Sequence, residues 1–447
     1  MKLQNSTSPF AFWSKMFLIY VMLLYSVAKS TTAIATGNDT DRLALLKFKE
    51  SISHDPHGIL HMWNDSVHFC SWPGIACSRR HQRITALNLS DYSLHGTISP
   101  YIGNLSFIRS LDFIGNSFLG KMPQQVGRLF RLQYLDLNGN MLEGNIPVNL
   151  SYCSHLRMLD VGKNRLTGLI PRELGSLVKL KVLYLHSNNL TGGIPSSLGN
   201  ISSLEQFSVA LNNLIGSVPD ELGRLKRLTL FAIGPNNLSG TIPFSIYNIS
   251  SMLFFSIPVN QFNDTLPPTI GLTLPNLRRV HAGDNKFYGI IPRSFSNASQ
   301  LRVLDMPGNN FVGQVPESLG MLRALRWLGL STNSLGNYLP NGLDFITSLT
   351  NCSRMQIVDL SNNKFRGVVP SSIANFSPTL YNLYLGGNQI SGNIPSVVEN
   401  LTNLITLGLD QNLFTGVIPA SLGKLKKLQA LYLDARRKYS YKNHRLS

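Results

Sequence analysis

Apolar and polar positions alternate along most of this chain with a long, regular period. Leucine or a similar residue fills the first, fourth and sixth of nine positions and asparagine the ninth, as in Leu132, Leu135, Leu137 and Asn140. The asparagines recur every 24 residues at Asn116, Asn140, Asn164, Asn188, Asn212, Asn236 and Asn260, then with small insertions at Asn285, Asn309, Asn333, Asn363, Asn388 and Asn412. A fixed period of this length predicts one stacked repeat array, because length alone would instead suggest several globular domains.

The nine-position pattern is the leucine-rich repeat signature. Alternating leucines place their side chains on one side of a short strand, so stacked repeats form a parallel β-sheet with the outward positions on a concave face. The asparagine follows the strand, where its amide can bond backbone groups that the turn leaves unpaired. We predict an α/β solenoid over residues 83–434, with fourteen complete repeats and a fifteenth beginning at Lys427.

Glycine and proline follow most of the asparagines at fixed distances, as in Gly144 with Pro147 and Gly168 with Pro171, although Asp264 and Asn337 replace the glycine. Glycine adopts backbone conformations that other residues avoid, and proline fixes φ and interrupts helices. The convex face is therefore expected to consist of extended segments and short 3₁₀ turns.

The motif N-x-L-x-G-x-I-P, found at Asn188–Pro195, resembles the plant-specific class of leucine-rich repeat. Residues 36–82 resemble the N-terminal cap of that class, with its helix at Thr40–Lys49 and a Cys70–Cys77 segment. The resemblance implies a disulfide between these two cysteines, which would brace the cap over the first repeat.

Residues 342–352 (GLDFITSLTNC), inside a 30-residue repeat, resemble one subfamily of plant receptor-like Ser/Thr kinases. That subfamily includes the receptor for bacterial flagellin and the rice bacterial-blight resistance receptor. Its members carry an extracellular repeat domain, a membrane helix and a kinase. Kinase motifs such as H-R-D and D-F-G are absent here, and the basic segment 435–447 fits no repeat, so we expect a chain truncated before the membrane helix and kinase.

The first 35 residues have the form of a secretory signal peptide. Lysines precede an apolar run at 16–28 that is short for a membrane span, and Ala33–Ala35 matches a cleavage site; a retained signal anchor is the alternative. Sequons for N-glycosylation stand at Asn38, Asn64, Asn88, Asn104, Asn149, Asn189, Asn200, Asn237, Asn248, Asn263, Asn297, Asn351, Asn375 and Asn400. These features predict a glycoprotein of the secretory pathway, in the apoplast or, in a full-length form, on the outer face of the plasma membrane.

Charge and chemistry-bearing residues favour no other class. The formal charge of +17 is concentrated partly in the two ends, without the clustered patch typical of nucleic-acid binding, so no nucleic acid is expected. His54, His57 and His61 are interrupted by helix breakers, and we expect neither a metal nor a cofactor. Cys153 and Cys352 lie eight repeats apart, too far to bridge, and are interpreted as buried thiols. No catalytic arrangement stands out, so the chain is not expected to be an enzyme.

Outward positions of the predicted strands carry aromatic and charged residues that the core does not require. We interpret them as a candidate ligand-binding surface, composed of Tyr134, Asp136, Asp160, Tyr184, His186, Arg279, His281, Asp305, Trp327, Asp359 and Tyr384. Exposed aromatics with charged neighbours suit an extended peptide, although solvated strands can carry such residues by chance.

The leading hypothesis is therefore ligand recognition, of a peptide or protein, by the extracellular part of a plant receptor-kinase-like protein, with immune perception as one role. The resemblance also implies a co-receptor kinase as partner of the full-length form. The alternative is a secreted leucine-rich repeat inhibitor of microbial wall-degrading enzymes, similar to polygalacturonase inhibitors.

Overall fold

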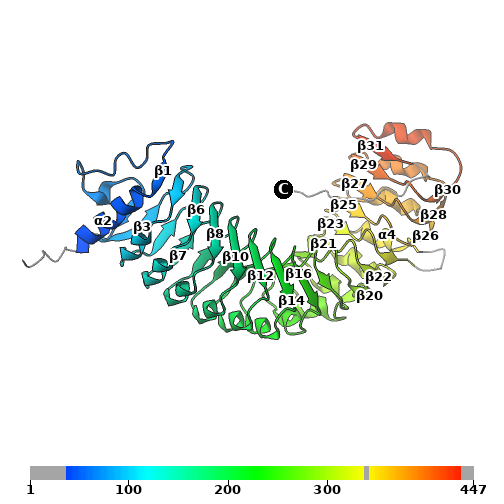
Figure 1. The fold of residues 1–447 in the computed structure, drawn as a ribbon. Helices are drawn as coiled ribbons and strands as arrows, with labels where there is room; N and C mark the ends of the chain where they lie inside the picture. The colour runs from blue at the N-terminus through cyan, green and yellow to red at the C-terminus, as the bar shows by residue number, and fades with distance from the viewer. Residues whose placement is uncertain (1–36, 337–341, 434–447) are drawn as a thin grey trace, which may run out of the picture.

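The repeats of the computed structural model follow one another along a single arc (Figure 1). The structure describes residues 37–336 and 342–433. The expected signal peptide at 1–35 and basic tail at 435–447 lie outside these residues. Strands line the inside of the arc and short helices its outside, as the repeat pattern predicts.

The concave face is a sheet of sixteen strands within the described residues. The first of them is antiparallel, and the other fifteen run parallel, one from each predicted repeat. They are β2 (Ile75–Cys77), β3 (Ile84–Asn88), β5 (Ser110–Asp112), β7 (Tyr134–Asp136), β9 (Met158–Asp160), β11 (Val182–Tyr184), β13 (Gln206–Ser208), β15 (Leu230–Ala232), β17 (Phe254–Ser256), β19 (Arg279–His281), β21 (Val303–Asp305), β23 (Trp327–Gly329), β25 (Ile357–Asp359), β27 (Asn382–Tyr384), β29 (Thr406–Gly408) and β31 (Ala430–Tyr432).

A second set of strands follows the asparagine turns, which the sequence pattern did not predict. One sheet contains β1 (Ile52–His54), β4 (His95–Thr97), β6 (Ser117–Lys121), β8 (Met141–Asn145), β10 (Arg165–Leu169), β12 (Asn189–Gly192), β14 (Asn213–Gly216), β16 (Asn237–Gly240) and β18 (Gln261–Phe262). Two smaller sheets contain β20 (Tyr288–Gly289), β22 (Asn310–Gly313) and β24 (Ser334–Leu335), and β26 (Arg366–Val368), β28 (Gln389–Gly392) and β30 (Leu413–Phe414).

Short helices form the convex face, and most are single 3₁₀ turns that begin just after the repeat proline. The 3₁₀ helices are η1 (Phe69–Ser71, in the cap), η2 (Pro100–Asn104), η3 (Gln124–Arg128), η4 (Val148–Tyr152), η5 (Arg172–Ser176), η6 (Ser196–Asn200), η7 (Asp220–Arg224), η8 (Ile246–Asn248), η9 (Arg293–Asn297), η10 (Glu317–Met321), η11 (Ser371–Asn375), η12 (Ser396–Asn400) and η13 (Ala420–Lys424). Two lengthened repeats have short α-helices instead, α3 (Ile270–Thr273) and α4 (Phe345–Leu349).

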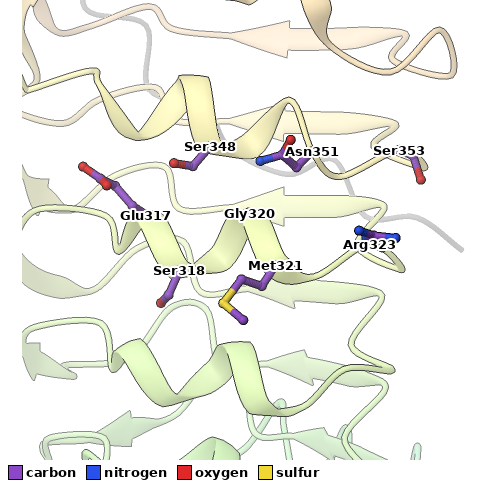
Figure 2. A pocket seen from close by; sticks show the side chains of 8 residues that line it. All are labelled: Glu317, Ser318, Gly320, Met321, Arg323, Ser348, Asn351 and Ser353. Carbon is purple, nitrogen blue, oxygen red and sulfur yellow. The ribbon is translucent and has the colours of Figure 1, made fainter.

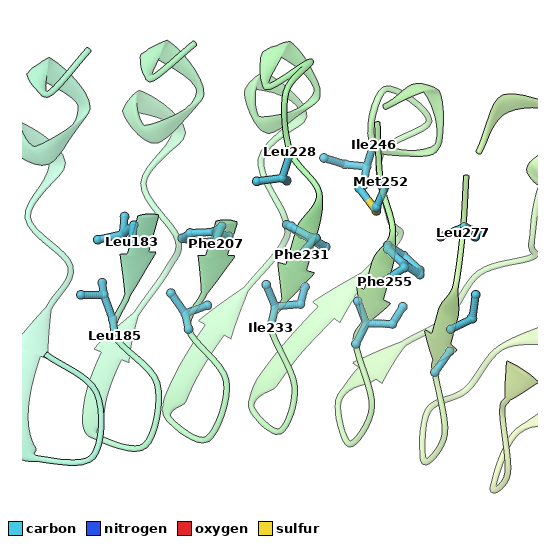
Figure 3. Packing of buried hydrophobic residues seen from close by; sticks show 14 of the residues in the cluster. Leu183, Leu185, Phe207, Leu228, Phe231, Ile233, Ile246, Met252, Phe255 and Leu277 are labelled. Carbon is cyan, nitrogen blue, oxygen red and sulfur yellow. The ribbon is translucent and has the colours of Figure 1, made fainter. Parts of the chain in front are cut away.

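One continuous core runs between the two faces. Inward residues of successive strands stack in rows, such as Leu183, Phe207, Phe231 and Phe255 (Figure 3). The rings of Phe207 and Phe231, and of Phe231 and Phe255, have centroids 6.0 Å apart. Each repeat therefore buries its apolar side chains mainly against its two neighbours, as expected of a solenoid.

The repeat asparagines join each turn to the preceding repeat. The Asn164 Nδ2 donates to the carbonyl of Leu137, 27 residues earlier, at 2.9 Å, and also to the carbonyls of Val161 and Gly162 in its own turn. Its Oδ1 accepts the N–H of Leu142, 22 residues earlier, at 2.9 Å. The same bonds recur along the array, so the amides form a ladder with backbone groups rather than with one another.

The residue before these asparagines has a left-handed conformation in every repeat except that of Asn236, where it is Pro235. The position is occupied by glycine in some repeats, such as Gly115, but by Val259 (φ 51°) and Thr332 (φ 54°) in others. A β-branched residue is strained at positive φ, at a cost of order 1 kcal/mol or more. The side chain of Val259 is 44% exposed, so it contributes little packing in return.

We therefore expect Val259→Gly to stabilise the chain by about 1 kcal/mol, since relief of strain exceeds the added freedom of the unfolded glycine. Thermal and denaturant unfolding would measure the change. Val312→Gly, an equally exposed valine within β22, is the matched control and should destabilise. A destabilising effect of Val259→Gly would show that no strain is stored at this turn.

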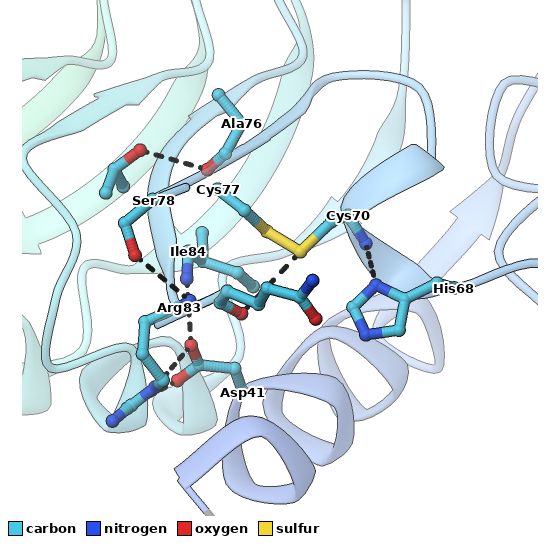
Figure 4. The surroundings of a disulfide bond; sticks show 10 residues. Asp41, His68, Cys70, Ala76, Cys77, Ser78, Arg83 and Ile84 are labelled. Atoms are coloured by element: carbon cyan, nitrogen blue, oxygen red, sulfur yellow. Dashed lines mark hydrogen bonds and ion pairs between the residues drawn. A yellow bond between two sulfur atoms is a disulfide. The ribbon is translucent and has the colours of Figure 1, made fainter. Parts of the chain in front are cut away.

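The N-terminal cap is attached to the first repeat by a buried ion pair. Asp41 of α2 (Gly37–Lys49) is fully buried. It accepts hydrogen bonds from Arg83 Nε at 2.9 Å and Nη2 at 2.8 Å, and from the N–H of Ile84 at 2.9 Å (Figure 4). The disulfide implied by the resemblance is present, joining Cys70 and Cys77 beside this pair.

The two remaining cysteines are buried free thiols, as predicted. Burial raises the pKa of both Cys153 and Cys352 to about 12. Each thiol contacts a carbonyl of the preceding repeat, Val126 at 3.4 Å and Leu319 at 3.5 Å respectively. They pack as small apolar residues and are not reactive groups.

Replacing Asp41 with alanine should detach the cap, because it leaves the guanidinium of Arg83 and the N–H of Ile84 without their partner. The expected loss is about 3 kcal/mol, the usual consequence of breaking a buried pair from one side. Hydrogen exchange would show it first in β3 and β5, since repeat arrays couple between neighbours. Asp65→Ala, which breaks an exposed pair with Arg42, is the control and should change stability by less than about 1 kcal/mol. Equal protection of β3 in both variants would contradict this role for Asp41.

Candidate ligand-binding surface

The outward side chains of the concave sheet form two clusters. We define the N-terminal cluster as Tyr134, Asp136, Asp160, Tyr184 and His186, on or directly after β7, β9 and β11. We define the C-terminal cluster as Arg279, His281, Asp305, Trp327, Asp359 and Tyr384, on β19 to β27. Every predicted ligand-binding residue lies in one of the two.

A row of three carboxylates runs across the N-terminal cluster. The strand pairing places Asp112 opposite Asp136 and Asp136 opposite Asp160. Asp160 accepts the N–H of Gly162 at 2.8 Å and the amide of Asn138 at 3.1 Å. Within residues 37–336 and 342–433, Asp136 accepts one hydrogen bond, from the N–H of Asn138 at 3.1 Å.

Crowding changes the acidity of the central carboxyl group. Asp136 is only 9% exposed. Burial raises the pKa of Asp136 to about 6, and the negative charges of Asp160 and Asp112 add to the rise. Asp136 therefore changes charge between about pH 5 and 7.

Tyr184 and His186 border this row with aromatic and imidazole rings. The Tyr184 hydroxyl donates to the Gln206 side chain, and the ring lies 5.9 Å from that of His186. Burial lowers the pKa of His186, although Asp160 opposes the change. The missing side chain of Gly162 makes room for the imidazole, because a Cβ there would lie 2.7 Å from it.

The C-terminal cluster is built from pairs that cross repeats. The guanidinium of Arg279 lies 5.6 Å from the ring centroid of Phe254. His281 Nδ1 is 3.3 Å from Asp305 Oδ2, and its ring meets that of Trp327 edge-on at 6.5 Å. An exposed cation and an imidazole on β19 thus stand close to an indole on β23, two strands away.

Gly329 provides the space for two members of this cluster. A Cβ at Gly329 would lie 2.2 Å from Asp305 Oδ1 and 2.9 Å from Trp327 Nε1. The indole N–H of Trp327 and the carboxylate of Asp305 therefore lie directly over the backbone of Gly329, where there is no side chain.

Asp359 and Tyr384 complete the cluster on the next strands. Asp359 Oδ1 accepts from the hydroxyl of Ser361 at 2.6 Å and from its N–H at 3.0 Å. Burial raises the pKa of Asp359 despite these bonds, and burial also raises the pKa of Tyr384.

Small side chains separate the two clusters. The positions equivalent to Asp160 on β13, β15 and β17 hold Ser208, Ala232 and Ser256. From β11 to β19 there are four strand spacings, about 19 Å at roughly 4.8 Å each. The other outward position of the same strands holds the larger Gln206, Leu230 and Phe254, so only one row of the sheet is small-sided between the two clusters.

Three further residues contribute to the two clusters, and the sequence pattern did not identify them as site residues. Asp112 stands at the same distance before its repeat asparagine as Asp136 does, so alignment of the repeats could have found it. Gln206 occupies an outward position of β13, but its bond to Tyr184 could not be predicted from the sequence. Gly329 gives no sequence signal, because its role is the absence of a side chain.

The sequons lie almost entirely away from this surface. Twelve of the fourteen asparagines are exposed, and Asn38 and Asn149 are half-buried. Asn104, Asn200, Asn248, Asn297, Asn375 and Asn400 each end a convex 3₁₀ helix. Only Asn88, at the end of β3, lies on a strand of the concave sheet.

The described part of the chain has neither a cluster of metal ligands nor a helix that could span a membrane. Residues 37–336 and 342–433 contain no group of three His, Cys, Asp or Glu side chains that could hold a metal ion. Over the same ranges, no helix has both the length and the apolar character that a bilayer crossing needs.

Models of known families match most of the repeat array. The leucine rich repeat N-terminal domain matches residues 38–78, and a leucine-rich repeat region matches 86–241. Leucine rich repeat models match 275–335, 354–376 and 378–435.

Similar curated proteins are plant receptor kinases. The chain is 64% identical over 375 residues to the LRR receptor-like serine/threonine-protein kinase EFR of Arabidopsis thaliana, covering 84% of this chain and 36% of that protein. It is 61% identical over 390 residues to a putative receptor-like protein kinase of the same plant, covering 87% of this chain and 38% of the relative. The chain thus spans little more than a third of the length of either relative.

Similar solved structures include plant peptide hormone receptors. The receptor RGFR1 in complex with RGF2 matches with a TM-score of 0.65 at 28% identity, over 76% of this chain and 61% of that one. The ectodomain of the Arabidopsis receptor kinase HAESA in complex with an IDA peptide hormone matches with a TM-score of 0.57 at 25% identity, over 88% and 80%. HAESA with IDA and the co-receptor SERK1 matches with a TM-score of 0.52 at 25% identity, over 88% and 81%.

The acidity of Asp136 predicts how stability depends on pH. Its native pKa lies above the ordinary value of 3.8, so the unfolded chain releases the proton first as the pH rises. This contribution to stability is present below about pH 4 and lost by pH 6 to 7. Asp136→Asn should therefore be about 3 kcal/mol more stable than the wild type at pH 7.5 and equal to it near pH 4.

Denaturant unfolding across this pH range would measure the difference. Glu143→Gln, which changes an exposed carboxylate on β8, should leave the two curves parallel. A pH-independent difference for Asp136→Asn would contradict the raised pKa.

Proposed function

Because the chain belongs to the leucine-rich repeat proteins and corresponds to the repeat region of plant receptor-like kinases, we propose that it recognises an extended peptide ligand outside the cell. The observation that carries this proposal is the pair of side-chain clusters on the concave sheet. Their aromatic and charged side chains face outward, so neither the core nor the asparagine ladder requires them.

The dimensions suit an extended chain rather than a small molecule. Tyr184 on β11 and Trp327 on β23 are six strand spacings apart, about 29 Å at roughly 4.8 Å per spacing. An extended peptide covers at most about 3.3–3.6 Å per residue, so about nine residues bridge the clusters. The row of Ser208, Ala232 and Ser256 leaves room for the backbone of such a peptide between the clusters.

The relatives support the same reading. The structures of RGFR1 and HAESA contain peptide hormones, and these are ectodomains of the same fold. The co-receptor in the HAESA complex supports a co-receptor kinase as a partner of this protein also. The resemblance of residues 342–352 to the flagellin-receptor subfamily supports immune perception as the role.

An extracellular location agrees with the chemistry of the described residues. A disulfide such as Cys70–Cys77 persists in oxidising compartments and is rare in the cytosol. Exposed sequons over the convex face are suited to glycans, which would leave most of the concave face open.

The proposal predicts that binding depends on both clusters. A secreted form of the chain would be panned against a displayed library of random peptides, beside a triple variant Tyr184→Ala, Arg279→Ala, Trp327→Ala. The wild type should enrich a defined sequence family, and each single change should weaken binding of the enriched peptide by about 1 kcal/mol or more, roughly fivefold.

The control is a triple variant of exposed, large residues on the convex side: Tyr152→Ala, Phe244→Ala and Leu272→Ala. It should enrich the same peptides as the wild type. If the concave variant enriches them equally, the site lies elsewhere. If the wild type enriches none, peptide recognition itself is contradicted.

A further inference from the structure

A pocket opens on the convex face beside the longest repeat. It lies between η10 and α4 and has a volume of about 830 Å³ (Figure 2). It is lined by Glu317, Ser318, Gly320, Met321, Arg323, Ser348, Asn351 and Ser353. A volume in the range of about 300–1,000 Å³ can receive a ligand of the size of a disaccharide.

The two convex helices beside the pocket approach each other closely at one point, as they do in other repeats that have a glycine at this position. The 30-residue repeat places α4 where other repeats have a 3₁₀ turn. Gly320 permits the contact, since a Cβ there would lie 2.2 Å from the carbonyl oxygen of Ser348. Figure 2 shows Asn351 above Gly320, with Glu317 toward one end of the opening and Arg323 toward the other.

The pocket contains a complete N-glycosylation sequon, Asn351-Cys352-Ser353. Asn351 and Ser353 both line it, whereas Cys352 points into the core and is fully buried. Asn351 is exposed, and no hydrogen bond joins its side chain to another described residue. At the equivalent position, the amide of Asn297 donates to the carbonyl of Ser294 at 2.9 Å.

We propose that the two core N-acetylglucosamine residues of a glycan on Asn351 are seated in this pocket. Arg323 and Glu317 supply a donor and an acceptor for acetamide and hydroxyl groups, and Ser318 and Ser348 line the floor. Met321 is 71% exposed and presents a polarisable apolar surface to the C–H face of a sugar ring. The glycan would connect the lengthened repeat to the one before it.

No sequon stands next to Asn351 on the side of the preceding repeat. Met321 occupies, one repeat earlier, the position that Asn351 occupies in its own repeat. The neighbour on that side is therefore a bare side chain and not a second glycan. The proposal requires passage through the secretory pathway and is independent of any ligand on the concave face.

Site-resolved resistance to a glycosidase would test the seat. The chain would be secreted from cells treated with a mannosidase inhibitor, so that every glycan is of the high-mannose type. Endoglycosidase H hydrolyses the bond between the two core sugars, which is the bond that the pocket would shield. Mass spectrometry of the folded chain should show cleavage at Asn351 at least tenfold slower than at Asn375, and equal rates after denaturation.

Variants separate the pocket from other causes of protection. Met321→Ala combined with Arg323→Ala should raise the rate at Asn351 to within about threefold of that at Asn375. Leu272→Ala, an exposed convex residue on another repeat, should leave the ratio unchanged. The proposal is overturned if Asn351 carries no glycan, if both sites are cleaved equally in the folded chain, or if the double variant leaves the protection intact.

Discussion

The hydrogen bonds of the repeat asparagines are the constraint on which the rest of the structure depends. Each side-chain amide joins its own turn to the repeat before it, and in the case of Asn164 all four bonds go to backbone groups. A buried amide or carbonyl left without a partner costs about 1–3 kcal/mol, so neither the side chain nor the turn can be changed alone. The ladder thereby sets the distance between strands and the register of the concave sheet. It also explains why residues as unsuitable as Val259 adopt positive φ directly before it.

Variation is confined to positions that leave the ladder unchanged. The 30-residue repeat shows this, because Asn363 still accepts the N–H of Leu335 at 2.9 Å and donates to the carbonyl of Leu330 at 2.9 Å. The extra residues lie between the asparagine turn and the next strand, on the convex side, where α4 replaces a 3₁₀ turn. The outward positions of the strands are the other free sites. Sequence differences between repeats are therefore concentrated on two surfaces, one with the pocket at Asn351 and one with the two concave clusters.

Much of this architecture could be predicted because it depends on spacing. The asparagine period predicted the concave strands and the ladder, the glycine and proline positions predicted the 3₁₀ turns, and the resemblance of the cap predicted its helix and disulfide. The second set of strands was missed because their residues, such as Asn189–Gly192, carry no apolar alternation of their own and pair only when neighbours are stacked. The candidate site residues could be listed, but not their partners. The bond from Tyr184 to Gln206 and the space above Gly329 exist only once two repeats lie in register.

Contacts between outward side chains of different repeats affect how tightly such a surface can bind a ligand. A long side chain on an open sheet would lose rotamer freedom when a ligand binds, at about 0.5–1.5 kcal/mol for each side chain immobilised. Here the loss is reduced beforehand, because Arg279 lies over Phe254, His281 is held by Asp305, and Trp327 meets the imidazole edge-on. The first two contacts join neighbouring repeats and the third spans two repeats, so the ladder that fixes the spacing of the repeats also holds the side chains in place. The rigidity of the solenoid is thus transmitted to its outward residues, and the peptide ligand that we propose would meet a preformed surface.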